Sequence, residues 1–441
     1  MEIALQIVFI LIVAVAVWLF SKNIGRIRRN ILLGHDEKIN DNPSLRWKNV
    51  LLLAFGQKKM FKNPLVAIMH FVIYAGFIII NAEVLEIVLD GVLGTHRLFT
   101  SVLPMGLYRF LINSFEFLAV GVTAVCVIFL IRRNVLKIKR FLSKDLDGWP
   151  HSDANYILIT EITLMLLFLT MNACDTLLQQ RGFGHYAEHP TGNFIFSSFL
   201  HPVLNGIGND GLLTIERVCW WLHIVGILSF LNYLPYSKHL HIMFAFPNAY
   251  YASLEPQGKM ENMPDIQKEV LYAMQPELVP ADAEPNHKKF GAKDIFDLSW
   301  KNLLDAYSCT ECGRCSAACP ANITGKKLSP RLIMMKTRDR AEEVGKNINT
   351  NKSFVDDGKS LLHNYITAEE LRACTTCNAC VEACPVSISP LDIILQQRRY
   401  LIMEESSAPQ EWNAMFSNIE NNFAPWKFSP DERDKWVSEM Q

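Results

Sequence analysis

Five long runs of apolar residues lie in the first 246 residues of this chain, and the rest is a more even mixture of polar and apolar positions. A helix of about 20 apolar residues is long enough to cross the hydrocarbon core of a bilayer. The runs cover Ile3–Phe20, Pro64–Ala82, Leu111–Ile131, Tyr156–Leu178 and Leu212–Pro235. Buried helices of a large soluble core are the alternative, and five runs with these flanks argue against it. The pattern predicts five transmembrane helices in residues 1–246.

The loops between these runs indicate an orientation. Lys and Arg number ten in residues 21–63 and six in 132–155, but only two in 83–110 and one in 179–211. Because basic loops stay on the cytoplasmic side, we expect a multi-pass protein of the bacterial inner membrane with its N-terminus outside. The first run has only Glu2 before it and no small-residue cleavage site, so we interpret it as a retained helix. Everything after about residue 236 is then expected in the cytoplasm.

The polar half of the chain divides into three parts. A proline-rich connector at 247–293 leads into a compact segment at 294–400. A polar and aromatic tail at 401–441 follows, which we expect to pack on that segment or on a partner. The formal net charge of the 441 residues is -1, which gives no indication of nucleic-acid binding.

Eight of the eleven cysteines fall in two runs of identical spacing, C-x2-C-x2-C-x3-C-P. This is the bacterial ferredoxin spacing, in which three cysteines bind one [4Fe–4S] cluster and the fourth binds the other cluster. We assign to the first cluster Cys309, Cys312, Cys315 and Cys384. We assign to the second cluster Cys374, Cys377, Cys380 and Cys319.

Zinc and disulfide bonds are the alternatives for these cysteines. A zinc site uses two CxxC pairs rather than a run of four cysteines closed by a proline, and here the run occurs twice. Disulfides do not persist in the reducing cytosol in which this segment is expected. The spacing therefore predicts a domain that transfers electrons.

Histidines in the apolar runs form the second chemical signal. His70 lies in the second run and His223 in the fifth, and His241 follows His223 by 18 residues. In a continuous helix, 18 residues are five turns, so His223 and His241 would share a face about 27 Å apart, while His239 would point elsewhere. Two histidines that far apart cannot bind one haem, but they suit two haems stacked across a bilayer. Ionisable residues in membrane helices are functional by default, although a histidine can also hydrogen-bond between helices.

The stretch from Trp221-Leu-His223 to Leu234-Pro235-Tyr-Ser-Lys-His-Leu-His241 resembles the fifth helix of the nitrate reductase gamma subunit. That family has five membrane helices, an outside N-terminus and b-type haems. The resemblance implies an inner haem b between His70 and His241, with His223 as an outer haem ligand. Where the family has a second histidine, ten residues after His70, this chain has Ile80. An outer haem would need a replacement ligand, for which His96 and His201 are candidates that nothing distinguishes.

The stretch Trp300-Lys-Asn-Leu-Leu-Asp305 and the first cysteine run resemble the iron–sulfur subunit of heterodisulfide reductase. Similar modules occur in anaerobic glycerol-3-phosphate dehydrogenase and succinate dehydrogenase. Together the two resemblances imply an all-α protein: a five-helix cytochrome b-like bundle followed by a mainly helical ferredoxin domain with two [4Fe–4S] clusters.

The chain has no Walker A, GxGxxG, GxSxG or flavin motif, and it lacks the CCG pattern that reduces disulfides in the heterodisulfide reductase family. We therefore expect the electron-transfer subunit of a quinone-linked oxidoreductase. It would connect menaquinone or ubiquinone, haem b and the two clusters to a cytoplasmic CCG-domain or flavoprotein subunit. Glu116 and Glu216, near the outer helix ends, are candidates to accept a quinol proton. The alternative is a haem-free membrane anchor that holds a ferredoxin arm, with the three histidines as structural polar contacts.

Overall fold

Helices are the main secondary structure in the part of this chain that the structure describes. The computed structural model describes residues 2–136, 138–188, 191–256, 258–260, 262–280, 289–427 and 429–440. The expected connector at 247–293 therefore lies partly outside the described residues. Within the described ranges there is no β-strand, and two isolated bridges are the only β pairing. The expected all-α fold class is confirmed, with five helices long and apolar enough to cross a membrane and a helical C-terminal region.

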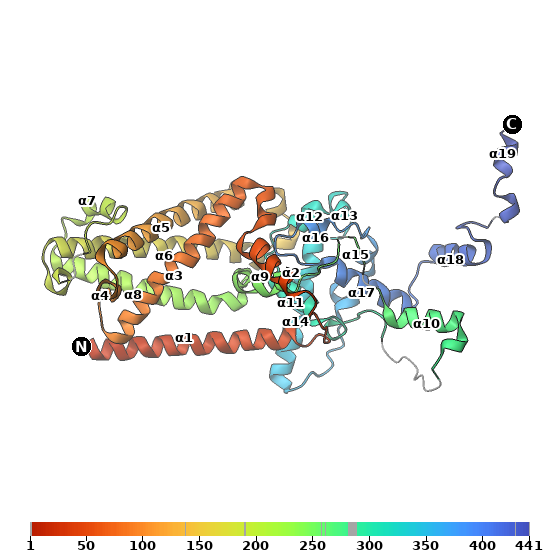
Figure 1. The fold of residues 1–441 in the computed structure, drawn as a ribbon, viewed down its shortest axis with the longest axis horizontal. Coiled ribbons are helices and arrows are strands. Elements are labelled where there is room, and N and C mark those ends of the chain that lie inside the picture. Colours follow the sequence, from red (N-terminus) through yellow and green to blue (C-terminus); the bar gives the residue numbers. More distant parts are fainter. Residues whose placement is uncertain are drawn as a thin grey trace.

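The five long helices lie side by side as a bundle (Figure 1). They are α1 (Glu2–Ile31), α3 (Pro64–Leu93), α5 (Met105–Asn134), α6 (Trp149–Gln180) and α8 (Asn209–Tyr233). Helix α6 packs between α5 and α8, and half of its most apolar stretch is buried, against 11% in α1. Large apolar side chains instead face outward on the bundle, among them Leu11, Phe117, Leu166 and Leu222. A surface of this kind is stable in lipid rather than in water.

Local sequence signals set the ends of α3. Asn63 caps its first turn by accepting a hydrogen bond from the Val66 N–H, and Pro64 occupies the first helical position, where its missing N–H costs nothing. Gly94 follows the last turn with a φ of 74°, a left-handed conformation that glycine adopts without strain. The cap and the proline fix where the helix begins, and therefore how deep His70 lies in the bundle.

The fifth membrane helix is not continuous to His241, and the shared face expected for His223 and His241 is therefore wrong. Helix α8 ends at Tyr233, two 3-10 turns span Leu234–Tyr236 and Lys238–Leu240, and α9 begins anew over His241–Tyr250. Between the turns Ser237 is extended, and its hydroxyl donates to Asp153 on α6 at 2.7 Å. Pro235 has no N–H for a helical bond, and the Ser237–Asp153 contact stabilises the break.

The C-terminal domain consists of short helices around the two cysteine runs. They are α11 (Trp300–Ser308), α12 (Arg314–Ala318), α13 (Pro320–Ile323), α14 (Pro330–Asn351), α15 (Ala368–Arg372), α16 (Ala379–Ala383) and α17 (Pro390–Met403). Arg340 of α14 is fully buried and forms ion pairs with Asp294 and Asp357. These ion pairs connect α14 to the segment before α11, which contains Asp294, and to the loop after α14, which contains Asp357.

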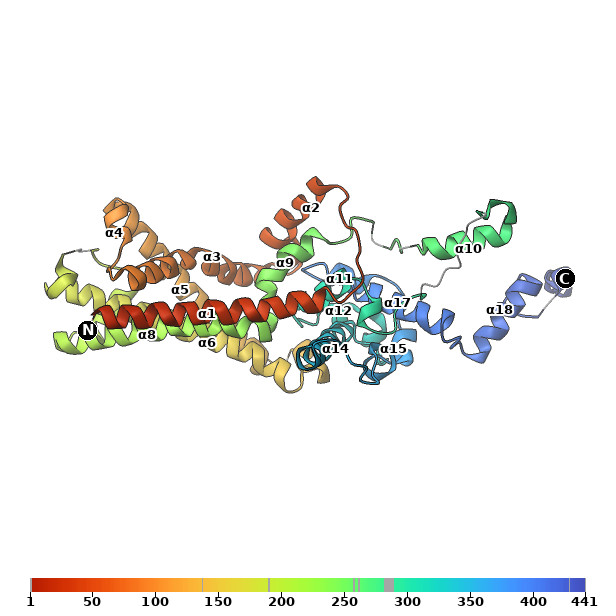
Figure 2. The ribbon, with the colours of Figure 1, turned by 90° about the horizontal axis from the view of Figure 1, so that it is seen from below.

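Smaller helices complete the described chain. They are α2 (Pro43–Asn49), α4 (Phe99–Val102), α7 (His201–Leu204), α10 (Pro264–Met274), α18 (Gln410–Asn422) and α19 (Lys435–Glu439). Helices α18 and α19 extend away from the C-terminal domain in both views (Figures 1 and 2). Their side chains are not buried, and only Trp412 approaches the domain, under the guanidinium of Arg372. Within the tail, Leu401 is buried in the core of the domain, whereas the large apolar residues of α18 and α19 are not buried.

The domain docks on the end of the bundle remote from the N-terminus (Figure 1). Backbone bonds join His35 after α1 to both Leu298 and Trp300, at 2.8 and 3.1 Å. Gly34 is required there, because a Cβ at this position would come within 2.7 Å of the Ser299 backbone. On the other side, Arg331 of α14 is buried and pairs with Asp145, in the loop after α5, at 3.0 Å. The two loops rich in Lys and Arg, in residues 21–63 and 132–155, thus hold the domain against the bundle.

We predict that Arg331→Met destabilises the docked protein by about 3–5 kcal/mol, because it removes one partner of a buried ion pair. The matched control is Lys327→Met, whose pair with Glu369 is exposed on both sides, so that about 0–1 kcal/mol is expected. Chemical denaturation of the detergent-purified protein, followed by circular dichroism, measures both. Equal losses in the two variants would contradict a role for Arg331 in docking.

Candidate metal centres

The two cysteine runs share one backbone conformation. In the first, Glu311 and Gly313 have φ values of 53° and 72°, and in the second Thr376 and Asn378 have 56° and 61°. Each pair of left-handed residues turns the chain around its cysteines, and each run then enters a short helix, α12 or α16. The fourth cysteine of each run is extended and precedes a proline. The repeated spacing in the sequence is therefore a repeated local structure.

One group of cysteines lines a cavity of about 340 Å³. Three come from the first run and one from the second: Cys309, Cys312, Cys315 and Cys384. Burial raises the pKa of the Cys315 thiol well above its usual range, and negative charge on the other three raises it further. Four thiols so placed repel one another as thiolates, and bound iron is the kind of positive charge that relieves the repulsion.

The second group contains the other four cysteines. Burial raises the pKa of the Cys380 thiol to about 12, and neighbouring charge on Cys374, Cys319 and Cys377 adds to the shift. Cys380 also adds to the pKa shift of Cys315, so the two groups are neighbours. The structure thus brings together the same two sets that the spacing predicts, with Cys319 and Cys384 exchanged between the runs.

The described residues hold no group of three His, Cys, Asp or Glu arranged for a single metal ion. The ligands of a [4Fe–4S] cluster bind separate irons at the corners of a cube rather than one shared ion. Backbone N–H groups also point at the sulfurs, from Thr376 to Cys374 and from Ile388 to Cys384, both at 3.4 Å. Bonds of this kind adjust the reduction potential of a cluster.

Glu311, inside the first run, connects the cysteines to the bundle. Its carboxylate accepts from Lys238 at 2.5 Å and from Arg338 of α14 at 2.7 Å. Burial alone would raise the pKa of Glu311, but the charges of Arg338 and Lys238 outweigh it and hold the pKa below its usual value. Sequence reasoning did not single out Glu311, and no local signal distinguishes it from a solvated glutamate.

His70 and His241 face each other across a second cavity. Their ring centroids are 6.5 Å apart, and the cavity holds about 1250 Å³ of empty space, part of it open to the surroundings. The cavity reaches Thr310, Cys312 and Arg314, which also line the cavity of the first cysteine group. The space between the two histidines therefore adjoins the first cysteine run directly.

His70 and His241 are both oriented through Nδ1. The His241 Nδ1 is 3.0 Å from the Lys238 carbonyl oxygen, which can only accept, so this nitrogen carries the proton. The His70 Nδ1 lies 3.0 Å from the side-chain oxygen of Gln57. Burial lowers the pKa of His241, although its bond to Lys238 opposes the shift. A neutral imidazole that donates through one nitrogen keeps the other free for a metal.

The expectation that His239 points away from this site is wrong. His239 lines the same cavity, with its ring 5.6 Å from that of His241. Burial, followed by the charges of His241 and His70, lowers the pKa of His239 to about 3. The reason is the break at Pro235, because the 3-10 turns after it rotate His239 away from its position on a continuous helix.

His223 lies in a third cavity, which holds about 530 Å³ of empty space, part of it open to the surroundings. Its Nδ1 bonds the Leu164 carbonyl at 3.0 Å, and its Nε2 is buried without a partner. Ile80 lines the same cavity, but His96 and His201 do not. His96 approaches Asp175 and His201 bonds Thr176. The structure therefore brings neither candidate replacement ligand to His223.

A family profile described as "4Fe-4S dicluster domain" matches residues 308–388. This range contains all eight cysteines of both runs. No solved structure matches the chain.

Three relatives show what the chain resembles. It is 28% identical to "Probable iron-sulfur-binding oxidoreductase FadF" of Bacillus subtilis, over 99% of this chain and 61% of the relative. It is 26% identical to "EtfAB:quinone oxidoreductase" of Syntrophomonas wolfei, over 96% of this chain and 56% of the relative. It is 30% identical to one subunit of the "Ferredoxin/F(420)H(2)-dependent CoB-CoM heterodisulfide reductase" of Methanosarcina acetivorans, over 27% of this chain and 60% of the relative. The chain spans less than two thirds of the length of these relatives.

The five candidate membrane helices, the matched domain and the relatives support a membrane protein with an iron–sulfur electron-transfer role. The expected resemblance of its cysteine domain to heterodisulfide reductase is confirmed by the match to the Methanosarcina acetivorans protein. The resemblance of the membrane domain to the nitrate reductase gamma subunit stays a prediction.

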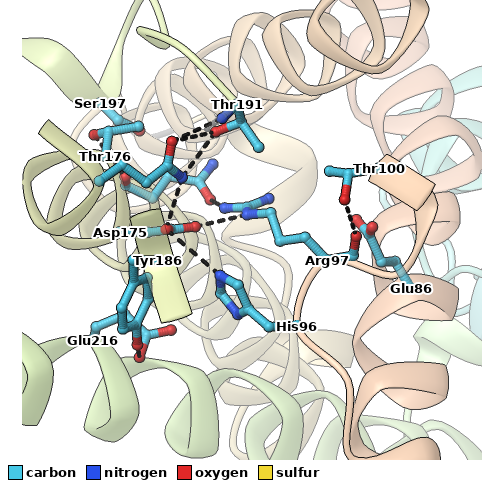
Figure 3. A network of polar contacts seen from close by, with 12 residues as sticks. Glu86, His96, Arg97, Thr100, Asp175, Thr176, Tyr186, Thr191, Ser197 and Glu216 are labelled. Atoms are coloured by element: carbon cyan, nitrogen blue, oxygen red, sulfur yellow. Dashed lines mark hydrogen bonds and ion pairs between the residues drawn. The ribbon is translucent and has the colours of Figure 1, made fainter. Parts of the chain in front are cut away.

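The end of the bundle remote from the C-terminal domain contains a buried polar network (Figure 3). Arg97 bonds Asp175 at 2.6 Å, and Tyr186 donates to Glu216 at 2.8 Å. Glu116 accepts from the backbone N–H groups of Phe196 and Ser197. Because Glu116 and Glu216 are already engaged in these contacts, the structure favours a structural role for both.

We predict that Gly313→Ala impairs cluster assembly. A Cβ at this position would approach Arg331 Nη1 to 2.6 Å in a backbone with a φ of 72°. The matched control is Gly325→Ala, where φ is also positive but nothing lies within 4 Å. Both variants have the strain of about 1–3 kcal/mol of a left-handed alanine, but only Gly313→Ala should lower the iron content below about eight per chain. Iron analysis of the purified protein measures this, and full loading of Gly313→Ala would contradict it.

Proposed function

We propose that this chain transfers electrons between a membrane quinone and a cytoplasmic redox partner, through haem b and two [4Fe–4S] clusters. The observation that carries the proposal is the cavity between His70 and His241, because its wall includes Cys312 of the first cysteine run. A membrane site and an iron–sulfur site that share wall residues are close enough for direct electron transfer.

The residues of this cavity fit haem b. Metal–imidazole bonds of about 2 Å on both sides of one iron place the ring centroids roughly 6 Å apart, close to the 6.5 Å between His70 and His241. Both histidines are fixed through Nδ1, which leaves Nε2 as the ligating atom. The rest of the wall is mainly apolar, as a macrocycle requires, and includes Leu53, Ile73, Phe77, Ile242 and Phe246. Haem b held here would supply a one-electron carrier between the membrane and the clusters.

For the clusters, we propose the two ligand sets that the sequence predicts. Cys309, Cys312, Cys315 and Cys384 would hold the first cluster, and Cys374, Cys377, Cys380 and Cys319 would hold the second. The shared cavity of the first set and the mutual charge effects within the second support this division. Glu311, Lys238 and Arg338 keep the first set fixed against the bundle.

The quinone and the partner rest on the relatives and on the charge pattern. The name "EtfAB:quinone oxidoreductase" supports a quinone, menaquinone or ubiquinone, on the membrane side. The proposed partner that performs the substrate chemistry is a CCG-domain or flavoprotein subunit, and the similarity to one subunit of a heterodisulfide reductase supports such a redox complex. The basic loops lie at the end where the iron–sulfur domain docks, which supports a cytoplasmic location for that domain and an outer N-terminus. The chain would then be the electron-transfer subunit of a quinone-linked oxidoreductase in the bacterial inner membrane.

We predict b-type bands, from about one haem per chain, in the dithionite-reduced minus air-oxidised spectrum. His70→Ala and His241→Ala should each abolish these bands, because each removes one of the two imidazoles that would hold the haem. The matched control His35→Ala removes an imidazole outside the cavity and should retain them. A fully iron-loaded protein without b-type bands would instead support the haem-free membrane anchor.

The ligand sets predict a pattern among serine variants. Cys309→Ser and Cys384→Ser, on different runs, should damage the same cluster and leave the same residual electron paramagnetic resonance spectrum after reduction. Cys374→Ser and Cys319→Ser should damage the second cluster, so that the residual spectrum of these two variants is that of the first cluster. If the Cys309 and Cys319 variants instead leave the same residual spectrum, each run binds its own cluster, and the proposed exchange of Cys319 and Cys384 between the runs is wrong.

A further inference from the structure

The cavity of His223 lies among α3, α5, α6 and α8, and most of its wall is apolar. Its polar side chains are Asn81, Glu161 and His223. Asn81 bonds the backbone of its own helix, at Phe77. Two groups, Glu161 and His223, are therefore available to a ligand.

The free nitrogen of His223 is a hydrogen-bond acceptor. Because the Leu164 carbonyl can only accept, the His223 Nδ1 donates to it and carries the ring proton. The Nε2 then has a lone pair, and it is buried without any partner in a side chain that is 1% exposed. A buried polar atom left unpaired costs about 1–3 kcal/mol. The site therefore favours a ligand that brings a hydroxyl or N–H group.

Glu161 lies twelve residues into α6, about 18 Å along the helix from Trp149. Its side chain is half-buried, and the hydrogen bonds and ion pairs found among the described residues do not include its carboxyl group. Glu161 and Phe77 line both this cavity and the cavity of His70 and His241. An ionisable residue at this depth is expensive unless it serves ion or proton movement. Glu161 is thus placed to handle a proton between the two sites.

Lipid has access to this cavity from the side. Phe77 is 40% exposed on the outer surface of α3, and Asn81, one turn later, is also exposed. A ligand dissolved in the bilayer can enter between the helices without crossing water. A ligand that fits the apolar wall, the free nitrogen of His223 and Glu161 has an apolar tail and a ring with two oxygen atoms that exchange protons.

We propose that this cavity binds the head group of the quinone or quinol, with His223 and Glu161 as its two proton-exchanging contacts. The inference rests on the proposed function and names the site of its membrane substrate. It also assigns His223 to the quinone rather than to an outer haem, since Ile80 offers no second iron ligand in this cavity.

The proton and electron balance follows from these two contacts. On quinol oxidation both O–H bonds break, one proton passes to the His223 Nε2 and the other to the Glu161 carboxylate. The quinol loses two electrons, which would pass one at a time to the one-electron carriers of the proposed function, and the quinone is released to the bilayer. Quinone reduction reverses each transfer. His223 and Glu161 then release their protons before the next turnover.

The test uses the full-length protein in detergent, with Glu161→Gln, His223→Phe and the control Thr163→Val. Thr163 lies on the same helix, is exposed and bonds only its own backbone. Each protein is assayed for haem per chain, for cluster reduction by dithionite and by a short-chain naphthoquinol, and for equilibrium binding of the corresponding naphthoquinone.

We expect Glu161→Gln to bind the naphthoquinone within a few-fold of the parent, but to be reduced by the quinol at least tenfold more slowly. His223→Phe should weaken binding about five- to tenfold, as for one lost hydrogen bond, and keep its haem. Both should be reduced by dithionite like Thr163→Val, which shows that the clusters are intact.

The failures of the two proposals are distinguishable. A parent protein that dithionite reduces but no quinol reduces overturns the proposed function, and this inference falls with it. If the parent is reduced by quinol and His223→Phe loses a haem, His223 is an iron ligand and the quinone site is wrong. Quinol rates and binding unchanged in both variants would likewise overturn the site.

Discussion

The docking of the cysteine domain on the end of the bundle is the interaction on which the rest of this structure depends. The cavity of His70 and His241 has walls from both parts, because Cys312, Arg314 and Pro385 close the space that the membrane helices leave open. Buried charges stabilise that contact, with Arg331 on Asp145 and Glu311 on Lys238. Since each of these pairs is largely withdrawn from water, separation of the two parts would expose or orphan charges on both sides.

The polar contacts in the cavity of His223 differ from the ion pairs and hydrogen bonds around Arg97. There, Arg97 pairs with Asp175 and Tyr186 with Glu216, so that these buried groups satisfy one another (Figure 3). In the cavity of His223, by contrast, the buried Nε2 of His223 has no partner, and the half-buried Glu161 lines the same wall. Buried polar groups are normally satisfied, so such exceptions inside a cavity indicate a ligand more directly than the number of carboxylates does.

The break at Pro235 connects local sequence to the geometry of the site. A continuous helix would carry His241 further along the axis of α8 and turn His239 to another face. The 3-10 turns and the Ser237–Asp153 bond instead place His239 and His241 together, opposite His70. Pro235 and Ser237 thus decide which histidines lie together. The spacing of 18 residues between His223 and His241 predicts a shared face only on a continuous helix, and the helix ends at Tyr233.

The sequence by itself determined the elements whose signals are local. Length and hydropathy specify the five membrane helices, and the spacing of the cysteines specifies both runs and predicts the exchange of Cys319 and Cys384. Only the tertiary structure decided what depends on residues far apart in the chain. Glu161 and His223 lie on different helices, and no pattern along either helix shows that they line one cavity. Glu311 resembles any loop glutamate until docking places Lys238 and Arg338 on either side of it. Burial and pairing arise from packing, which a one-dimensional pattern does not encode.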